Sequence, residues 1–183
     1  MKNFKRIAVT SPVFTTEEVT VVCRLLDDGF WRIHVRKPES TEKELTHFLD
    51  TIPVRYRSRI VIHDHFALCS YFGLAGIHLN RRCTQVPEHF SGSLSCSCHT
   101  FEEVVLMKDK VDYIFLSPVF DSISKSGYSS AFTHEQLAEA ALRGIIDHRV
   151  FALGGVTPDK YSFLQRYHFG GAAMLGAIWN KTI

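Results

Sequence analysis

Eight short runs of β-forming residues recur along the chain between helix-like stretches, and this alternation constrains the fold more than any other feature of the sequence. Strands that alternate with helices build a parallel sheet, because each helix returns the chain to the start of the next strand. Eight of them favour an α/β fold of the (β/α)8 TIM barrel type, with an open doubly wound sheet as the alternative. The runs cover residues 6–11, 30–37, 59–65, 75–80, 93–100, 112–120, 149–155 and 170–178.

The helix-like stretches carry recognisable start signals. Each has threonine as its expected N-cap, and the last has Pro158 as its expected first helical residue. They cover residues 15–29, 41–52, 99–109, 133–145 and 157–169. A further helix is expected over 65–73.

The chain has 183 residues, which is short for a fold that typically needs about 250. Two parts of the fold are expected to be shortened: the connection 81–92 holds at most one helical turn, and no full eighth helix follows the last strand. We therefore predict one domain over 1–183. Apolar surface left near the last strand is expected to be covered by a partner subunit, which predicts a homodimer.

Composition excludes several classes of partner. The formal charge of +2 comes without a dense Lys/Arg cluster, so no nucleic acid is expected, and the apolar runs are far shorter than a membrane span. The start of the chain lacks the apolar core of a signal peptide. Five scattered cysteines without a CxxC pair indicate reduced thiols, which predicts a cytoplasmic protein.

Ligands of (β/α)8 barrels bind at the carboxyl ends of the strands, so the polar residues there are the site candidates. The second run places His34 and Arg36 on one face, because side chains alternate along a strand. The guanidinium of Arg36 offers a fork of donors that suits a phosphate, and a surface salt bridge is the alternative.

The third run ends in Asp64, flanked by two histidines. Its carboxylate could bind Mg²⁺ through oxygen, or it could cap the helix expected over 65–73. The fourth run carries His78, for which a hydrogen-bonded interior position is more typical than catalysis.

The fifth run alternates between cysteines and polar residues. Ser97 and His99 face the expected site, and the imidazole of His99 could act as a general acid and base near neutral pH. Cys96 and Cys98 face the other way and are expected to pack as small apolar side chains.

The sixth run leads into a loop with two hydroxyls and a cation, Ser122, Ser124 and Lys125. This loop is interpreted as a cradle for a phosphate or pyrophosphate, with a solvated surface loop as the alternative. Glycines at the ends of the seventh and eighth runs allow backbone N–H groups to approach a phosphate.

The order of these motifs resembles the thiamine phosphate synthase family, which includes the related thiazole tautomerases. The resemblance covers nearly the whole chain. It rests on "HVRK", "AGIHL", "CHTFEEV", "DYIFLSPVF", "SISK" and "ALGGVTPDKY", in family order and with family-like spacing. It implies a barrel, assembled as a dimer, that joins hydroxymethylpyrimidine pyrophosphate to thiazole phosphate with the help of Mg²⁺.

The resemblance also shows departures on the pyrophosphate side. In the family's Gln-x-Arg-x-Lys stretch the arginine matches Arg36, but the lysine falls at Pro38, which leaves Lys37 as a possible replacement. In the family's Asn-Asp pair the metal ligand matches Asp64. The second metal aspartate falls at Cys83 and is missing.

The remaining family positions carry over residue by residue. Ser97 matches a serine on the pyrimidine side, and Gly155 and Gly176 fall where backbone groups meet the thiazole phosphate. The implied substrate-binding residues are His34, Arg36, Lys37, His63, His78, Ser97, Ser122, Ser124, Lys125, Gly155 and Gly176.

The first hypothesis is the synthase reaction, with Lys125, Arg36 and Mg²⁺ on Asp64 holding the pyrophosphate while its C–O bond breaks. The alternatives are a metal-independent thiazole tautomerase with His99 as acid and base, and a non-catalytic protein that binds thiazole or thiamine phosphate. An unrelated phosphate-binding barrel enzyme is the fourth possibility.

Overall fold

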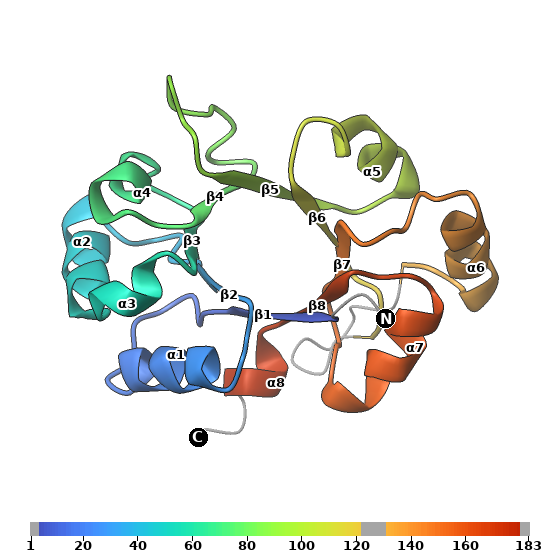
Figure 1. Cartoon of the computed structure of the whole chain (residues 1–183), viewed down its shortest axis with the longest axis horizontal. Coiled ribbons are helices and arrows are strands. Elements are labelled where there is room, and N and C mark those ends of the chain that lie inside the picture. The colour runs from blue at the N-terminus through green and yellow to red at the C-terminus, as the bar shows by residue number, and fades with distance from the viewer. Residues whose placement is uncertain (1–3, 122–130, 180–183) are drawn as a thin grey trace. The chain divides into compact units, whose positions relative to one another are not determined.

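Eight strands follow one another in chain order and close into a barrel, β1 to β8 (Figure 1). The computed structural model describes residues 4–121 and 131–179. The closed order confirms the (β/α)8 barrel and excludes the open doubly wound sheet. The strands are β1 Lys5–Val9, β2 Arg32–Val35, β3 Ile60–Ile62, β4 Gly76–Leu79, β5 Ser93–Cys98, β6 Tyr113–Leu116, β7 Val150–Ala152 and β8 Gly171–Met174.

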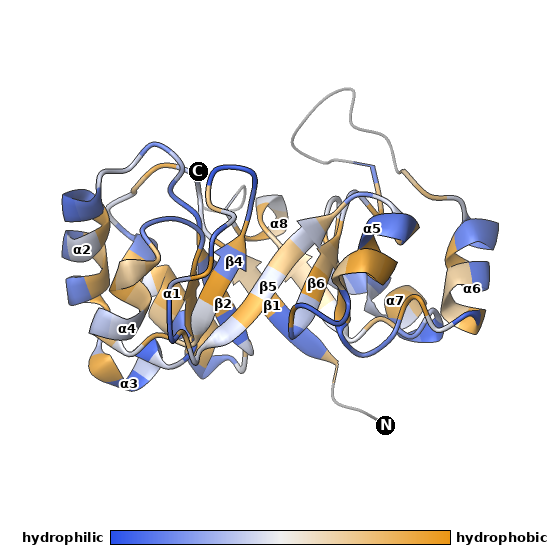
Figure 2. Cartoon of the chain, turned by 90° about the horizontal axis from the view of Figure 1, so that it is seen from above, coloured by the Kyte–Doolittle hydropathy of each residue, from blue (hydrophilic) through white to orange (hydrophobic). Residues whose placement is uncertain are grey.

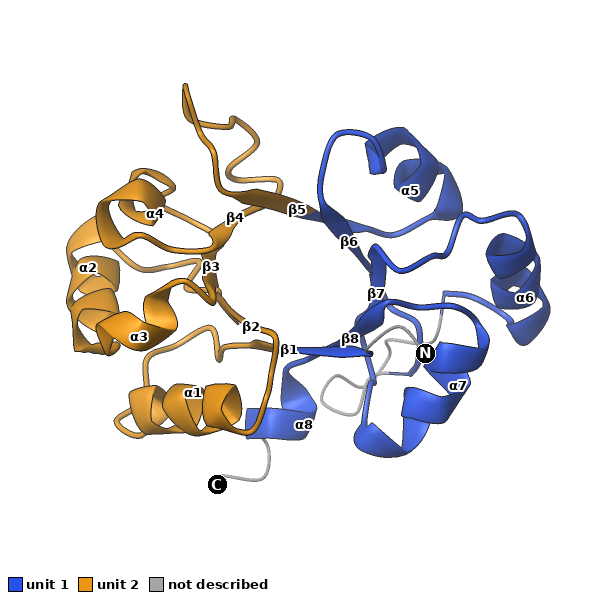
Figure 3. Cartoon of the chain, viewed as in Figure 1, with its two compact units in different colours: residues 1–7, 96–183 blue, residues 8–95 orange. Residues whose placement is uncertain are grey.

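The chain divides into two compact units, one of residues 8–95 and one of residues 1–7 with 96–183 (Figure 3). In the unit 8–95, β2, β3 and β4 pair in parallel, with Ile33 opposite Ile60 and Ile62 opposite Ile77. These apolar strand residues are fully buried and form the core of this unit. Its helices are α1 Glu18–Asp27, α2 Glu42–Thr51, α3 Val54–Arg57 and α4 Ala67–Phe72.

In the other unit, β6, β7 and β8 pair in parallel, with Ile114 opposite Val150 and Phe151 opposite Gly171. Its helices are α5 Phe101–Met107, α6 His134–Leu142, α7 Tyr161–Arg166 and α8 Gly176–Trp179, with the 3-10 turn η1 Pro158–Lys160 before α7. Within the described residues, which end at 179, the last helix is a single turn and no helix lies between β4 and β5, so both predicted shortenings of the fold are confirmed.

Amphipathic spacing explains why the helices pack as they do. In α2 the buried side chains are Leu45, Phe48 and Leu49, three and four residues apart, so they form one stripe. Figure 2 shows this helix with one hydrophobic and one hydrophilic side. The stripe packs toward the strands, and the charged side chains stay in water.

Threonine caps begin three of the predicted helices. The hydroxyls of Thr41, Thr100 and Thr133 each accept a hydrogen bond from the backbone N–H three residues on. The expected threonine cap of the first helix is wrong: α1 begins only at Glu18, and the carbonyl of Thr15, not its hydroxyl, accepts the Glu18 N–H.

In the last predicted helix, Pro158 does open the first turn, as expected, but Thr157 makes no side-chain cap bond. The turn α3 carries no such start signal and was not predicted. No helix within residues 4–121 and 131–179 has the length and apolar character needed to cross a membrane.

Candidate active site

Three buried histidines from neighbouring strands meet in the unit 8–95. His34 lies on β2, His63 directly follows β3, and His78 lies on β4. The His34 Nδ1 and His63 Nε2 atoms are 3.0 Å apart, and the rings of His63 and His78 stack with centroids 4.2 Å apart. The hydroxyl of Ser95 lies 2.9 Å from His78 Nδ1. The predicted interior, hydrogen-bonded position of His78 is therefore confirmed.

Burial keeps these imidazoles neutral. Desolvation is the main cause that holds the pKa of His34 and of His63 well below the ordinary value, and it lowers the pKa of His78 to about 3. The guanidinium of Arg36 adds to the lowering for His63 and His78. A ligand nitrogen from each ring lies within 4.8 Å of the others, so the cluster could also hold a metal ion.

Arg36 offers unused donors beside this cluster. Its backbone is fixed, because its N–H donates to the hydroxyl of Thr10 at 3.0 Å. Its side chain is half-buried, and none of the described residues forms a hydrogen bond or ion pair with its guanidinium. The surface salt bridge considered for Arg36 is thus not seen among residues 4–121 and 131–179. The guanidinium is available to an anionic ligand.

Lys37 forms a buried ion pair with Glu18. It is only 1% exposed, and its ammonium contacts both carboxylate oxygens of Glu18, at 2.7 and 2.6 Å. The carbonyls of Ser11 and Val13 accept from it as well, at 2.8 Å each. Because an ammonium has three donors and these acceptors use them all, the placement argues against Lys37 as a substitute for the missing strand-two lysine.

Desolvation opposes the charges of this buried pair. Burial lowers the pKa of Lys37 and raises the pKa of Glu18, while the attraction between the two partners acts in the opposite sense on each. The short contacts favour the ionised pair, which links α1 to the end of β2.

Asp64 is held by an arginine that sequence reasoning did not select. Arg82 donates from Nε and Nη2 to Asp64 Oδ1, at 3.1 and 3.0 Å, and from Nη2 to Oδ2 at 3.3 Å. The Cys83 sulfur lies 4.0 Å from Asp64 Oδ1. The helix-cap alternative for Asp64 is wrong, because the N-cap of α4 is Phe66 and no side chain caps it.

A tight turn after β4 places Arg82. The backbones of Asn80 and Cys83 exchange hydrogen bonds of 3.0 and 3.1 Å. The side-chain oxygen of Asn80 accepts the Arg82 N–H at 2.9 Å, and its amide nitrogen donates to the carbonyl of His63 at 2.5 Å. The signal that could have found Arg82 is its position directly before Cys83, in the stretch "HLNRRC".

His99 follows β5 in the unit that contains residues 96–183. Its Nδ1 atom lies 2.8 Å from the carbonyl of Ser117, and because a carbonyl only accepts, Nδ1 carries the proton. The backbone N–H of His99 donates to Glu103 at 2.6 Å. The ring is exposed. Cys96 and Cys98 are buried, as expected for small apolar side chains.

The glycine positions are partly explained. Gly155 has φ of 60°, and a Cβ atom there would collide with the carbonyl oxygen of Asp121 and lie 2.9 Å from the Phe120 Cβ. Gly176 is the first residue of α8. Ser97 is exposed at the end of β5. The phosphate-loop residues Ser122, Ser124 and Lys125 lie outside the described residues.

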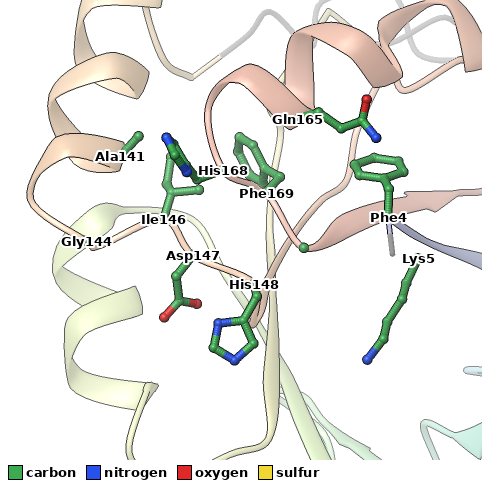
Figure 4. Close-up of a pocket in the computed structure, with 11 residues that line it drawn as sticks. Phe4, Lys5, Ala141, Gly144, Ile146, Asp147, His148, Gln165, His168 and Phe169 are labelled. Carbon is green, nitrogen blue, oxygen red and sulfur yellow. The ribbon is translucent and has the colours of Figure 1, made fainter. Parts of the chain in front are cut away.

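A surface pocket of about 760 Å³ lies at the amino ends of the strands in the unit of residues 1–7 and 96–183 (Figure 4). Lys5 opens β1, His148 precedes β7, and Gly170 precedes β8. Barrel enzymes act at the carboxyl ends of their strands. This pocket at the amino ends is therefore not the candidate active site.

The chain is a closed (β/α)8 barrel, and basic and titratable side chains lie at the carboxyl ends of its strands. These features place it in the class of barrel enzymes. The sequence model of the family described as thiamine monophosphate synthase matches residues 7–178. The chain belongs to this family.

Individual relatives agree. A solved structure, the thiamine phosphate pyrophosphorylase from Bacteroides thetaiotaomicron, is 42% identical with a TM-score of 0.89, over 97% of this chain and 86% of that one. A thiamine-phosphate synthase from Caldicellulosiruptor bescii is 29% identical over 87% of this chain and 75% of its own length. One from Serratia proteamaculans is 24% identical over 88% of this chain and 80% of its own length.

Proposed function

We propose that the chain joins hydroxymethylpyrimidine pyrophosphate to thiazole phosphate, giving thiamine phosphate and pyrophosphate. The observation that carries the proposal is the Arg36 guanidinium at the end of β2, which pairs with none of the described residues and lies beside neutral, buried histidines. Membership of the family supplies the reaction class.

In this reaction the thiazole nitrogen attacks the methylene carbon of the pyrimidine. The new C–N bond forms as the C–O bond to the pyrophosphate breaks, and the leaving oxygen keeps the bonding electron pair. Arg36 stabilises the negative charge that grows on the leaving group, and the neutral histidines beside it leave its guanidinium as the cation of this cluster. The proposed partners of Arg36 on the pyrophosphate are Ser122, Ser124 and Lys125.

Mg²⁺ does not fit the described residues around Asp64. A hard cation takes oxygen ligands, but the Asp64 carboxylate is already bound to Arg82 and the position of a second carboxylate is Cys83. Burial, and then the nearby Asp64 charge, raise the pKa of the Cys83 thiol, so it stays protonated. No step of the proposed mechanism therefore passes through a metal ion.

We also propose an oligomeric state, a domain organisation and a cellular location for the enzyme. The family resemblance supports a homodimer and a single functional domain over 1–183. The five free cysteines, Cys23, Cys69, Cys83, Cys96 and Cys98, support a cytoplasmic location.

A steady-state assay with both substrates tests the reaction. We expect the wild-type chain to release pyrophosphate, and R36Q to lower kcat/KM for the pyrimidine substrate by about 100-fold, the scale for losing a donor to developing charge. R24Q, a matched change on the exposed side of α1, should leave the rate unchanged. Absence of pyrophosphate release, or isomerisation of the thiazole ring that H99A abolishes, would contradict the proposed reaction.

A further inference from the structure

The ion pair between Arg82 and Asp64 occupies the place where the family resemblance implies a metal ion. Asp64 matches one metal carboxylate, and Cys83 falls at the other. Arg82 is the residue next to that lost carboxylate, and its guanidinium grips the one that remains, with three contacts of 3.0 to 3.3 Å. The missing carboxylate at Cys83 and the added guanidinium of Arg82 therefore lie at the same point of the fold.

We infer that the Arg82 guanidinium binds the diphosphate group of the substrate directly, in place of a divalent metal ion. The inference rests on the proposed function for the identity of the substrate, and it adds a binding residue and metal independence.

The charges of the two arrangements are equal. A divalent ion between two carboxylates has a net formal charge of zero, and so has one guanidinium beside one carboxylate. Replacing an aspartate by Cys83 removes one negative charge, and replacing the ion by Arg82 removes one positive charge. The net formal charge that meets an incoming anion is thereby the same without a metal.

The guanidinium is oriented and still has a donor to offer. Nε and Nη2 of Arg82 are used by Asp64, whereas Nη1 donates to none of the residues that the structure describes. The Arg82 side chain is 43% exposed, and that of Asp64 only 10%. Asp64 thus acts as a buried anchor for a partly exposed fork, the geometry that suits a phosphate.

The backbone under Arg82 is fixed as well. The Asn80 side chain accepts the Arg82 N–H and donates to the His63 carbonyl, and so ties the turn to the end of β3. Asp64 follows His63 directly. The hydrogen bonds of the Asn80 side chain therefore fix the backbone of both Asp64 and Arg82, which reduces the entropy lost when a ligand binds.

Mg²⁺ would have to break this pair to bind Asp64. It would gain one carboxylate and no second protein carboxylate, because the residue beside Asp64 is a cysteine, with the Cys83 sulfur 4.0 Å from Asp64 Oδ1. Mg²⁺ gives up its water reluctantly and prefers sites with more oxygen ligands.

Calorimetric titration of the full chain with inorganic pyrophosphate tests the inference. We expect wild type to bind it in EDTA, and R82Q to bind at least about 10-fold more weakly in EDTA, as for the loss of one charge-assisted contact. R81Q, a matched change at the neighbouring exposed arginine, should keep wild-type affinity.

A restoring variant sharpens the test. R82Q/C83D returns a second carboxylate beside Asp64, so its pyrophosphate binding should recover with Mg²⁺ and not in EDTA. If R82Q fails to fold, R82K serves in its place: it keeps the charge, loses the fork, and should bind more weakly than wild type.

The outcomes separate the two proposals. Wild-type binding that requires Mg²⁺, or R82Q and R82K binding as tightly as wild type in EDTA, overturns the role of Arg82 and leaves the synthase reaction standing. Binding that survives EDTA and depends on Arg82, in a chain that releases no pyrophosphate from its substrates, supports the role of Arg82 and overturns the reaction.

Discussion

Three histidines link the stability of the unit 8–95 to pH. His34, His63 and His78 have folded-state pKa values below 6.5, mainly because burial penalises the charged ring. In the unfolded chain the same rings take up protons as the pH falls through 6.5. Their stabilising contribution is therefore complete above pH 6.5 and is lost as the pH falls toward the folded pKa, about 3 for His78.

We expect the free energy of unfolding to decrease by up to about 1.4 kcal/mol per pH unit for each of these histidines below that point. H34Q, which keeps a polar side chain, should remove one histidine's share of the slope. H47Q, on the exposed side of α2, should not change it. Urea unfolding at several pH values between neutrality and mild acid measures the slope; equal slopes for wild type and H34Q would contradict the assignment.

Among the elements, the turn between β7 and η1 depends on Gly155. It has φ of 60°, and its missing Cβ lets the chain pass close to the Asp121 carbonyl. Gly144, at the end of α6, has φ of 68° with open space around it. The two glycines share the left-handed backbone and differ only in crowding, so they form a matched pair.

We expect G144A to cost about 1 to 2 kcal/mol of unfolding free energy, the cost of a left-handed non-glycine residue. G155A should cost more, because the added methyl group must displace the backbone at Asp121. Urea unfolding of both variants tests this, and equal losses would show that the crowding at Gly155 is relieved without cost.

Local sequence patterns predicted the existence of the helices better than the residues at which the helices begin. Thr41 and Thr133 each form a reciprocal capping box with the residue three positions on, a pattern contained within four residues of sequence. The start of α1 could not be placed in this way, because Glu18 is recruited by Lys37, which lies 19 residues further along. The turn α3 follows Pro53 for only four residues, too short for a helical period to appear.

For the whole molecule, the alternation of eight strands was enough to predict the barrel. The same reasoning brought His34, Arg36 and His78 to strand ends in one unit. It missed Arg82, because the contact with Asp64 joins residues 18 apart and depends on the fold of the turn between them. It also left Lys37 open as a ligand, since the buried partner that engages it lies in another element.

At the scale of assembly, we expect a homodimer. Sedimentation velocity at micromolar concentration should give a single species of twice the chain mass of 20.8 kDa. A species of the chain mass throughout the concentration range would contradict the dimer, and with it the expectation that a partner covers apolar surface near the last strand.

The buried ion pair of Lys37 has a consequence for chemical labelling. An amine-reactive reagent needs an accessible, deprotonated amine, and Lys37 is shielded and fully hydrogen-bonded while α1 stays on β2. Lys43, exposed at the start of α2, reacts from the native state. The ratio of the Lys37 and Lys43 labelling rates can be measured by mass spectrometry. This ratio therefore reports how often α1 separates from β2 by local unfolding.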